Sequence, residues 1–369
     1  MKISSSRAAG FTFVELLASS TLIVLLMLVL VSMTDATTKT WQYTSRKIEQ
    51  FQGARVGFES MTRRLSQATL NTYWDIETVT TGSGATETTV PKTYVRRSEL
   101  RFISGPMSIF TEGDPRYPTH GTFFQAPLGF VEDRSKYGGL TNLLNTWGYF
   151  VEVGEEGAPV PTPLLKEVKP RWRSRLKEFM EPSERLGVYK GQADPDTGFV
   201  VPITGASDRS WFKDPLMAKT RPVRTLAENI VALILLPQLP AGDLAAKSGS
   251  VLAPGYLYDS TVENSNEDIN PHHQLPPVVQ VIMVAIDEES ARRLDEKAPR
   301  SPDLGLSFGQ LFQDPEVLLQ GTGAGGGGGA ASMGDLQRLE AVLVARKVNY
   351  RIFNSNVIIR GAKWGRENN

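Results

Sequence analysis

An uninterrupted apolar run near the N-terminus constrains this chain more than any other feature. Between Glu15 and Asp35 no residue carries a charge. About 20 apolar residues, at about 1.5 Å rise per residue, are what a helix needs to cross the hydrocarbon layer of a membrane. The two charges before the run, Lys2 and Arg7, are both positive. This asymmetry predicts a single membrane-spanning helix with its N-terminus in the cytoplasm and everything after residue 35 on the far side.

The end of the run argues against a removable secretory signal. Such a signal has a short apolar stretch followed by a small-x-small cleavage site, whereas this run ends in LVSMT at residues 30–34. Glu15 is a second anomaly, because an ionised acid deep in a membrane is costly unless it meets a cation. Glu15 is therefore either a functional residue or an interfacial residue of an ordinary signal anchor.

The sequence GFTFVELL at residues 10–17 resembles the type IV prepilin signature, the processing and assembly segment of type IV pilins and type II secretion pseudopilins. The resemblance implies that residues 1–10 are a leader, that a prepilin peptidase cuts between Gly10 and Phe11, and that Phe11 is then N-methylated. It also implies that Glu15 faces the terminal ammonium of a neighbouring Phe11 during filament assembly. Such a pair tolerates burial, whereas removing one partner costs roughly 3–5 kcal/mol.

The helix is expected to continue beyond the membrane. No proline occurs before Pro91, and apolar residues recur at spacings of three, four and seven, which places them on one stripe that we interpret as core. The stripe comprises Trp41, Ile48, Phe51, Phe58, Met61, Leu65 and Ala68. We predict a transmembrane and assembly helix over residues 11–34, its amphipathic continuation over 35–70 with local bending at Gly53 and Gly57, and an extracytoplasmic domain over 71–369.

The rest of the chain predicts an α+β, pilin-like fold, in which the long N-terminal helix packs on a domain with an antiparallel sheet and long loops. Apolar runs at 230–236 and 278–286 predict buried central strands. Further strands are expected at 100–104, 122–125 and 147–153, and helices at 171–180, 288–297 and 335–347, the last with Leu336, Leu339 and Leu343 on one face. Residues 78–93 read as a flexible connection, and residues 349–359 as a hairpin around Asn354 and Ser355.

Composition excludes several classes of function. The 40 basic and 40 acidic residues give a formal net charge of zero, which argues against nucleic-acid binding driven by bulk charge. The absence of cysteine excludes disulfides, thiolate zinc sites and a cysteine nucleophile. No Ser-His-acid spacing or carboxylate pair stands out, so we expect neither an enzyme nor a cofactor.

Two patterns fit a ligand but have simpler interpretations. The basic stretch at 166–177, with Trp172 and Phe179, fits a nucleic-acid patch, although a solvated helix face with one buried side is favoured. Residues 321–326 satisfy the dinucleotide pattern GxGxxG. Because no alternating strands and helices surround them, we interpret them as a flexible loop.

Histidines and acids give two candidate metal patterns. Adjacent residues point apart on a helix or strand, so His272 and His273 are a poor chelate, and we interpret them and His120 as surface loop residues. The loop after residue 258 offers oxygen ligands for calcium but lacks an EF-hand glycine, so a mobile polar loop is favoured. Its acids and amides are Asp259, Glu263, Asn264, Asn266, Glu267, Asp268 and Asn270.

Two broader layouts extend the resemblance. Residues 59–68 with the strand at 100–103, and Leu275-Pro276-Pro277 leading into 278–285, are similar to the layout of the type II secretion minor pseudopilin J. Residues 226–231, 284–288 and 360–364 resemble the Verru_Chthon cassette protein C family, a pilin-like group, and this resemblance covers nearly the whole chain.

These resemblances imply a pilin-like structural subunit at or within a type IV pilus or type II secretion-like filament. Its expected partners are a prepilin peptidase, other pilin or pseudopilin subunits and an inner-membrane assembly platform. It is expected in the bacterial inner membrane with its domain in the periplasm, or in a filament at the cell surface, and the bulky domain favours a minor subunit. The alternative is a single-pass membrane-anchored adhesin or binding protein that uses the prepilin pathway.

Overall fold

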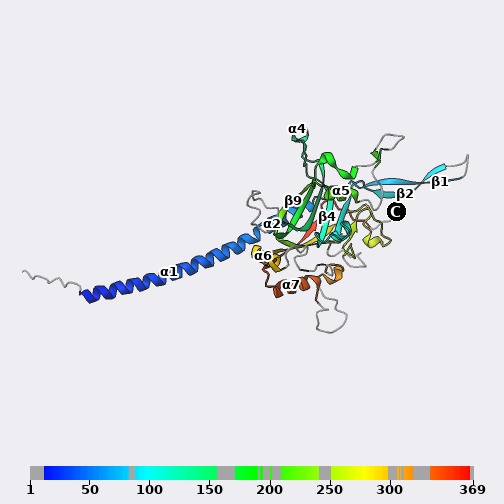
Figure 1. Cartoon of the computed structure of the whole chain (residues 1–369). Helices are drawn as coiled ribbons and strands as arrows, with labels where there is room; N and C mark the ends of the chain where they lie inside the picture. Colours follow the sequence, from blue (N-terminus) through cyan, green and yellow to red (C-terminus); the bar gives the residue numbers. More distant parts are fainter. Residues whose placement is uncertain are drawn as a thin grey trace, which may run out of the picture. The chain divides into compact units, whose positions relative to one another are not determined.

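The structure is a computed structural model that describes residues 12–82, 88–155, 171–189, 192–193, 200–201, 209–240, 251–297, 306, 308, 311–318 and 333–365. These residues form a long apolar N-terminal helix and a set of antiparallel sheets (Figure 1). The α+β class and the antiparallel sheet predicted from the sequence are thus confirmed. The chain divides into two compact units, residues 1–52 and 53–369.

The first unit is dominated by helix α1 (Phe13–Gln50). The segment Phe13–Asp35 is long and apolar enough to cross a membrane, and none of it is buried within the structure. It is consistent with a signal sequence or a single membrane anchor. Trp41, predicted to be core, is 69 % exposed. That prediction was wrong because helical spacing identifies a face of a helix and not what covers it.

Helix α2 (Gln52–Leu65) follows α1 after a break at Phe51. The expected single helix to residue 68 is therefore two helices, and the break precedes Gly53 instead of falling at either glycine. From Phe51 onward the predicted stripe is buried, as expected, at Phe51, Phe58, Met61, Leu65 and Ala68. The side chain of Ile48 lies outside the described residues.

The second unit contains two main sheets, in which all neighbouring strands are antiparallel. The six-stranded sheet has the order β11 (Tyr258–Asp259), β3 (Phe102–Pro106), β4 (His120–Pro127), β5 (Leu144–Glu155), β6 (Trp172–Glu181) and β9 (Val223–Glu228). The three-stranded sheet has the order β10 (Ile230–Gln238), β12 (Val278–Ile286) and β13 (Tyr350–Ile358).

Smaller elements complete the described part of the second unit. Two short sheets are formed by β1 (Tyr73–Thr81) with β2 (Thr88–Arg97) and by β7 (Gln192–Ala193) with β8 (Val200–Val201). The helices are α3 (Met107–Phe110), α4 (Arg134–Tyr137), α5 (Ser210–Met217), α6 (Glu288–Lys297) and α7 (Asp335–Ala345). Short 3₁₀ turns lie at Ser183–Arg185, Gly187–Tyr189, Glu267–Ile269 and Pro315–Val317.

Strands β10 and β12 of the three-stranded sheet are buried on both faces, which explains their nearly continuous apolar runs. One face of these two strands belongs to a cluster that includes Leu294 of α6 with Leu339 and Leu343 of α7. Toward α2, the ring of Phe353 on β13 lies 5.6 Å from the ring of Phe58. The predicted strands at 230–236 and 278–286 and the predicted helices at 288–297 and 335–347 are all confirmed.

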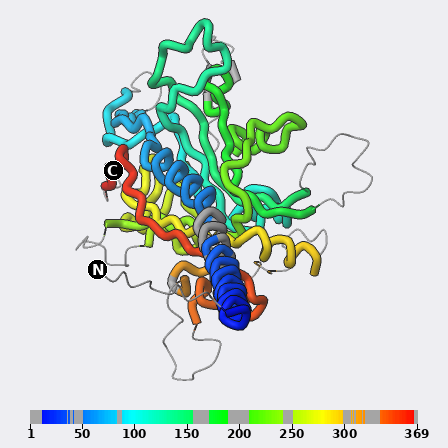
Figure 2. Tube along the Cα trace, turned by 90° about the vertical axis from the view of Figure 1, so that its left-hand side faces the viewer, coloured from blue at the N-terminus to red at the C-terminus, as the bar shows by residue number. Residues whose placement is uncertain are grey.

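Helix α2 packs against both main sheets. At Gly57 the backbone lies so close to β9 that a Cβ atom would stand 3.0 Å from Cβ of Ala227. Beyond the C-terminal end of the helix, the backbone N–H of Arg360 donates to the carbonyl of Ser66 at 3.0 Å. Figure 2 shows α2, in blue, running beside β13, in red. The helix therefore packs on an edge strand of each of the two sheets, which share no strand.

Helix α5, which was not predicted from the sequence, covers the opposite face of the six-stranded sheet. The ring of Phe212 stacks on Phe123 of β4 with centroids 4.1 Å apart and an interplanar angle of 16°. Trp211 and Leu216 are buried beside it. With eight residues and an internal Pro215, the helix is too short and irregular to show a clear period.

Three local predictions were wrong. Residues 78–93 lie largely in the hairpin of β1 and β2, since their alternating Thr and Val residues favour strands. Residues 172–181 form strand β6 instead of a helix. The predicted terminal hairpin is the single strand β13, whose residues pair with β12 from Tyr350 to Ile358. A nine-residue apolar partner strand outweighs the turn preference of Asn354 and Ser355.

Candidate functional site: the start of α1 and its apolar surface

The first turn of α1 is held by a reciprocal pair of contacts between Thr12 and Glu15. The backbone N–H of Glu15 donates to Oγ1 of Thr12 at 3.3 Å. In return, the backbone N–H and the hydroxyl of Thr12 each donate to Oε2 of Glu15 at 2.9 Å. This is a capping box, which satisfies two amides that a helix start otherwise leaves unpaired. The sequence signal for this box is the T-x-x-E pattern before an apolar run.

Of the three residues predicted for processing and assembly, the structure places only Glu15. Its carboxylate lies at the N-terminal end of α1, where it also interacts favourably with the helix dipole. Gly10 and Phe11 lie outside the described residues. The structure therefore gives Glu15 a local contact that the sequence analysis did not foresee.

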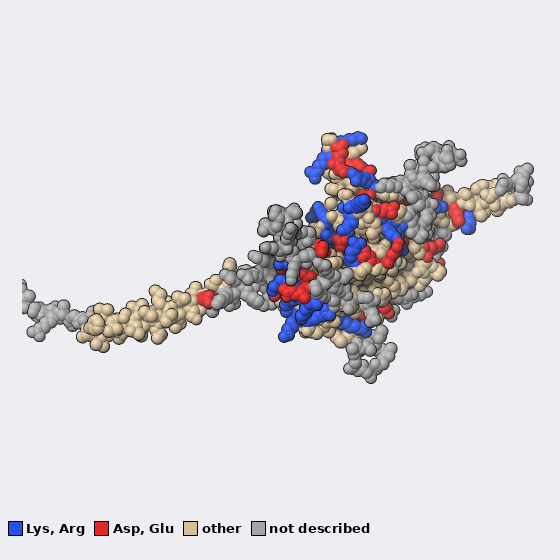
Figure 3. Space-filling model, in the orientation of Figure 1, with Lys and Arg blue, Asp and Glu red and all other residues tan. Residues whose placement is uncertain are grey.

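The surface of α1 that follows Glu15 is apolar all round. Every large apolar side chain from Phe13 to Met33 is 52–79 % exposed, and Figure 3 shows this part of the helix almost free of charged atoms. A contiguous apolar surface of this size is not stable in water and marks a membrane or protein contact. This surface is consistent with a signal sequence or a single membrane anchor.

The hydroxyl groups within this surface are satisfied by the helix itself. Oγ of Ser19 and Oγ of Ser20 donate to the carbonyls of Leu16 and Leu17 at 3.0 and 2.9 Å. Further along, Oγ1 of Thr34 donates to the carbonyl of Leu30 at 2.8 Å. Because lipid offers no hydrogen bonds, this internal pairing suits the helix to a bilayer or to a dry helix interface.

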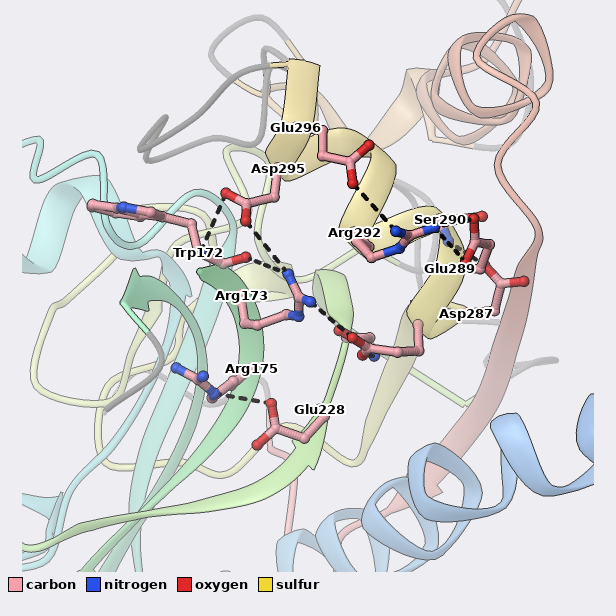
Figure 4. Close-up of polar contacts among 12 residues, drawn as sticks. Trp172, Arg173, Arg175, Glu228, Asp287, Glu289, Ser290, Arg292, Asp295 and Glu296 are labelled. Carbon is pink, nitrogen blue, oxygen red and sulfur yellow. Dashed lines mark hydrogen bonds and ion pairs between the residues drawn. The ribbon is translucent and has the colours of Figure 1, made fainter. Parts of the chain in front are cut away.

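In the basic stretch considered for nucleic-acid binding, Arg173, Arg175 and Lys177 are paired with acids. Arg173 is 3 % exposed and contacts Glu288 of α6 at 2.8 Å and Asp295 at 3.9 Å (Figure 4). Arg175 contacts Glu228 of β9 at 2.9 Å (Figure 4). These guanidiniums tie β6 to α6 and β9, so their charges serve packing. Residues 166–170 lie outside the described part of the chain.

The polar loop after β11 is organised by its own backbone. Side-chain oxygens of Asp259, Asn264 and Asn266 accept amide hydrogens from residues two positions ahead, and the amide oxygen of Asn270 accepts from Asn264 and His272. Among the described residues, no group of three or more His, Asp or Glu side chains is placed to hold a metal ion. The side-chain oxygen atoms of this loop thus stabilise tight turns of its backbone. The glycine-rich pattern at 321–326 lies outside the described residues.

His120 is not a surface residue, contrary to the prediction. It is buried at the start of β4, where its Nδ1 accepts from the backbone N–H of Leu235 on β10 at 3.2 Å. Its Nε2 lies 3.4 Å from the carbonyl of Phe312, so Nε2 carries the hydrogen. Burial lowers the pKa of His120 to about 4. This neutral imidazole joins the two main sheets.

A buried carboxylate that the sequence did not reveal fixes α2 to the six-stranded sheet. Glu178 of β6 is fully buried and forms ion pairs with Arg64 of α2 and Arg224 of β9. It also accepts from Nε1 of Trp147 and the hydroxyl of Tyr149, both at 2.9 Å. These partners come from three separate segments, α2, β5 and β9, with no common motif, so no local pattern predicts them.

The start of α1 is the candidate site, because it combines the predicted Glu15 with a surface that needs a partner. No family model, curated protein or solved structure matches the chain.

Proposed function

We propose that this chain is a pilin-like structural subunit, anchored in the bacterial inner membrane and assembled into or at the tip of a type IV pilus or type II secretion-like filament. A prepilin peptidase cuts it between Gly10 and Phe11, and its domain lies in the periplasm before assembly. The observation that carries the proposal is the fully exposed apolar helix that begins at the capped turn holding Glu15. The bulk of the second unit favours a minor subunit.

The same surface serves both states of such a subunit. In the membrane the apolar side chains of α1 contact lipid, and in a filament they contact helices of other subunits. Because lipid and helix surfaces are similarly apolar, transfer between them is governed by packing and by polar contacts. The carboxylate of Glu15 supplies such a contact, since it pairs with the terminal ammonium of Phe11 on a neighbouring subunit.

The first experiment measures the intact mass and N-terminal residue of the chain, expressed with and without a prepilin peptidase and recovered from membranes. The expected product begins at N-methylated Phe11 only when the peptidase is present. The Gly10→Leu variant is a matched control that keeps the membrane helix but blocks the cut. A chain that retains Met1 in the presence of the peptidase contradicts the proposal.

One observation favours the alternative function, a single-pass membrane-anchored adhesin or binding protein that uses the prepilin pathway. The capping box gives Glu15 a role within its own helix, and this role requires no neighbouring subunit. Under this alternative, the carboxylate stabilises the helix start and the exposed apolar surface of α1 remains in lipid.

Two substitutions separate the two functions. Glu15→Gln keeps the capping box, which accepts Glu or Gln at this position, but removes the charge. Thr12→Val removes the capping hydroxyl and keeps the charge. For a filament subunit we expect Glu15→Gln to reduce recovery in sheared filaments at least about tenfold, while Thr12→Val is still incorporated.

The control is Asp35→Asn, which removes a carboxylate from the other end of the apolar segment. Membrane insertion and cleavage of all three variants are measured in the same samples, so a loss of incorporation is separated from a loss of protein. Incorporation of Glu15→Gln at the wild-type level would overturn the filament function and support the anchored binding protein.

A further inference from the structure

A cavity of about 310 Å³ lies at the base of the hairpin formed by β1 and β2. Its two walls are the hairpin and the segment 263–274, both in the second unit. The hairpin contributes Trp74, Arg96 and Arg97 to the lining, and the segment contributes Glu263, His272, His273 and Gln274. This cavity is remote in sequence from Glu15 and takes no part in the function proposed above.

Cations surround the cavity at His273, because Arg96 and Arg97 line it. Burial, followed by the neighbouring His272 and by Arg97, Arg96 and Arg101, lowers the pKa of His273 to about 4. The pKa of His272 is lowered by burial and by the same arginines of β2, against the opposing effect of Glu263. The two imidazole rings lie 4.0 Å apart. Both are therefore neutral at pH 7 while they face a group of guanidinium cations.

The carboxylates around the cavity have defined positions. Asp75 contacts Arg97 at 2.6 Å, and Glu77 contacts Lys92 at 3.1 Å, so these two acids lie on hairpin cations. Glu263 lines the cavity and favours the charged form of His272, whereas no acid is among the groups that shift the pKa of His273. The end of the cavity at His273 is thus the end at which negative charge is most stabilised.

The backbone is shaped to present His273 at this point. Its φ of 52° lies in the left-handed region, which is disfavoured for residues other than glycine. The conformation is held by a hydrogen bond from the backbone N–H of His273 to the carbonyl of Ser260 at 2.8 Å. Backbone strain of this kind gathers at ligand sites.

A second feature is the close approach of the backbone at Gly365 to the side chain of Arg96. Gly365 exchanges two hydrogen bonds with the side-chain amide of Gln274, at 2.8 and 3.0 Å. A Cβ atom at residue 365 would stand 2.7 Å from Nη2 of Arg96. The absence of a side chain there leaves room for the guanidinium, which lies over the ring of Trp74 at 5.2 Å.

We propose that this cavity binds an oxyanion, a phosphate or carboxylate group, between the guanidiniums of Arg96 and Arg97 and the imidazoles of His272 and His273. Guanidinium forks match the paired oxygens of such groups and form charge-assisted hydrogen bonds with them. The bound anion offsets the field of the arginines, so the imidazoles take up protons when it binds. Binding therefore becomes tighter as the pH falls.

The test uses the full chain in a non-ionic detergent at low ionic strength, with isothermal titration calorimetry at about pH 5.5 and about pH 8. Inorganic sulfate represents the tetrahedral, phosphate-like ligand and formate the planar carboxylate, because both keep their charge over this range. We expect saturable binding that is tighter at the lower pH and takes up protons, seen as a dependence of the heat on the buffer. The tighter-binding ion identifies the ligand class.

Variants distinguish a built site from diffuse charge. Arg96→Gln is expected to weaken binding at least about tenfold, and Gly365→Ala to weaken it by displacing Arg96 without removing its charge. His273→Asn, which tolerates the left-handed backbone, is expected to reduce the pH dependence. Arg292→Gln on α6 removes an exposed charge and is expected to leave binding unchanged. Circular dichroism confirms that each variant is folded.

Two results would overturn the proposal. One is the absence of saturable binding of either ion to the wild-type chain. The other is that Arg96→Gln and Arg292→Gln weaken anion binding equally, which would mean that net charge alone accounts for the binding.

Discussion

At the scale of single residues, the domain depends on a neutral imidazole between its sheets. Nδ1 of His120 accepts a backbone hydrogen from β10, so it cannot carry a proton without losing that bond and opposing the N–H of Leu235. Burial disfavours the charged form as well, and the pKa falls from 6.5 to about 4. The contact between the sheets is therefore sensitive to acid.

The consequence is a defined pH dependence of stability. Because the folded pKa of His120 is below its unfolded value, the unfolded chain takes up the proton first as the pH falls. Stability that is present above about pH 6.5 is lost toward about pH 4, by on the order of 3 kcal/mol from this residue. Urea unfolding of the wild type and of His120→Asn, followed by tryptophan fluorescence, measures the loss. An equal pH dependence in the variant would contradict this account.

Glu178 gives a second prediction at the same scale. Glu178→Gln leaves Arg64 and Arg224 beside a buried site without its charge, and it should lower the free energy of unfolding by about 3–5 kcal/mol. The control is Glu59→Gln, which breaks an exposed pair with Arg55 and should change stability by about 1 kcal/mol or less. The comparison fails if both variants unfold at the same urea concentration.

At the scale of elements, the docking of α2 on β9 depends on the missing side chain of Gly57. Gly57→Val adds three carbon atoms, the first of which, Cβ, would stand 3.0 Å from Cβ of Ala227. Overpacking of this kind costs about 1–3 kcal/mol. Gly53→Ala is the matched substitution on the same helix, where a Cβ meets no atom within 4 Å.

Opposite signs are therefore expected for the two glycines. Gly53→Ala should raise the free energy of unfolding by up to about 1 kcal/mol through helix propensity alone, whereas Gly57→Val should lower it. Thermal unfolding monitored by circular dichroism gives the sign of each change. A stabilising Gly57→Val would mean that α2 does not pack on β9 as described.

The sequence predicts an element well when the spacing of its apolar residues matches the way a helix or a strand is buried. Strands β10 and β12 are almost entirely apolar because both of their faces are covered, and α7 shows its leucines at helical spacing. Strand β6 was missed because its arginines are buried against acids that lie 50 or more residues away. Because these buried residues are charged, β6 lacks the alternation of apolar and polar residues that predicts a strand.

The candidate site was predictable to a similar degree. The position of Glu15 followed from its place in an apolar run, and the capping box was readable from four residues. The cavity beside His273 was not predictable, because a left-handed histidine, two arginines of a hairpin and a glycine near residue 365 come together only through tertiary packing.

At the scale of the whole molecule, the apolar part of α1 contributes nothing to the core of the domain. The candidate span Phe13–Asp35 is not buried anywhere in the structure, and the second unit begins at Gly53. A chain lacking residues 1–35 is therefore expected to leave the membrane fraction and to keep cooperative unfolding. Fractionation and thermal unfolding test this, and aggregation of the shortened chain with loss of secondary structure would contradict it.

The position of α2 also determines how the domain responds to tension. A pull on the first turn of α2, directed along the helix axis, acts in shear on its packing against β9 and β13. The far end of the helix is fixed by the ion pair of Arg64 with Glu178 and by the bond between Arg360 and Ser66. Contacts loaded in shear must break together, whereas a peeled strand loses its bonds singly. Force that enters at Gly53 is therefore shared by two sheets at once.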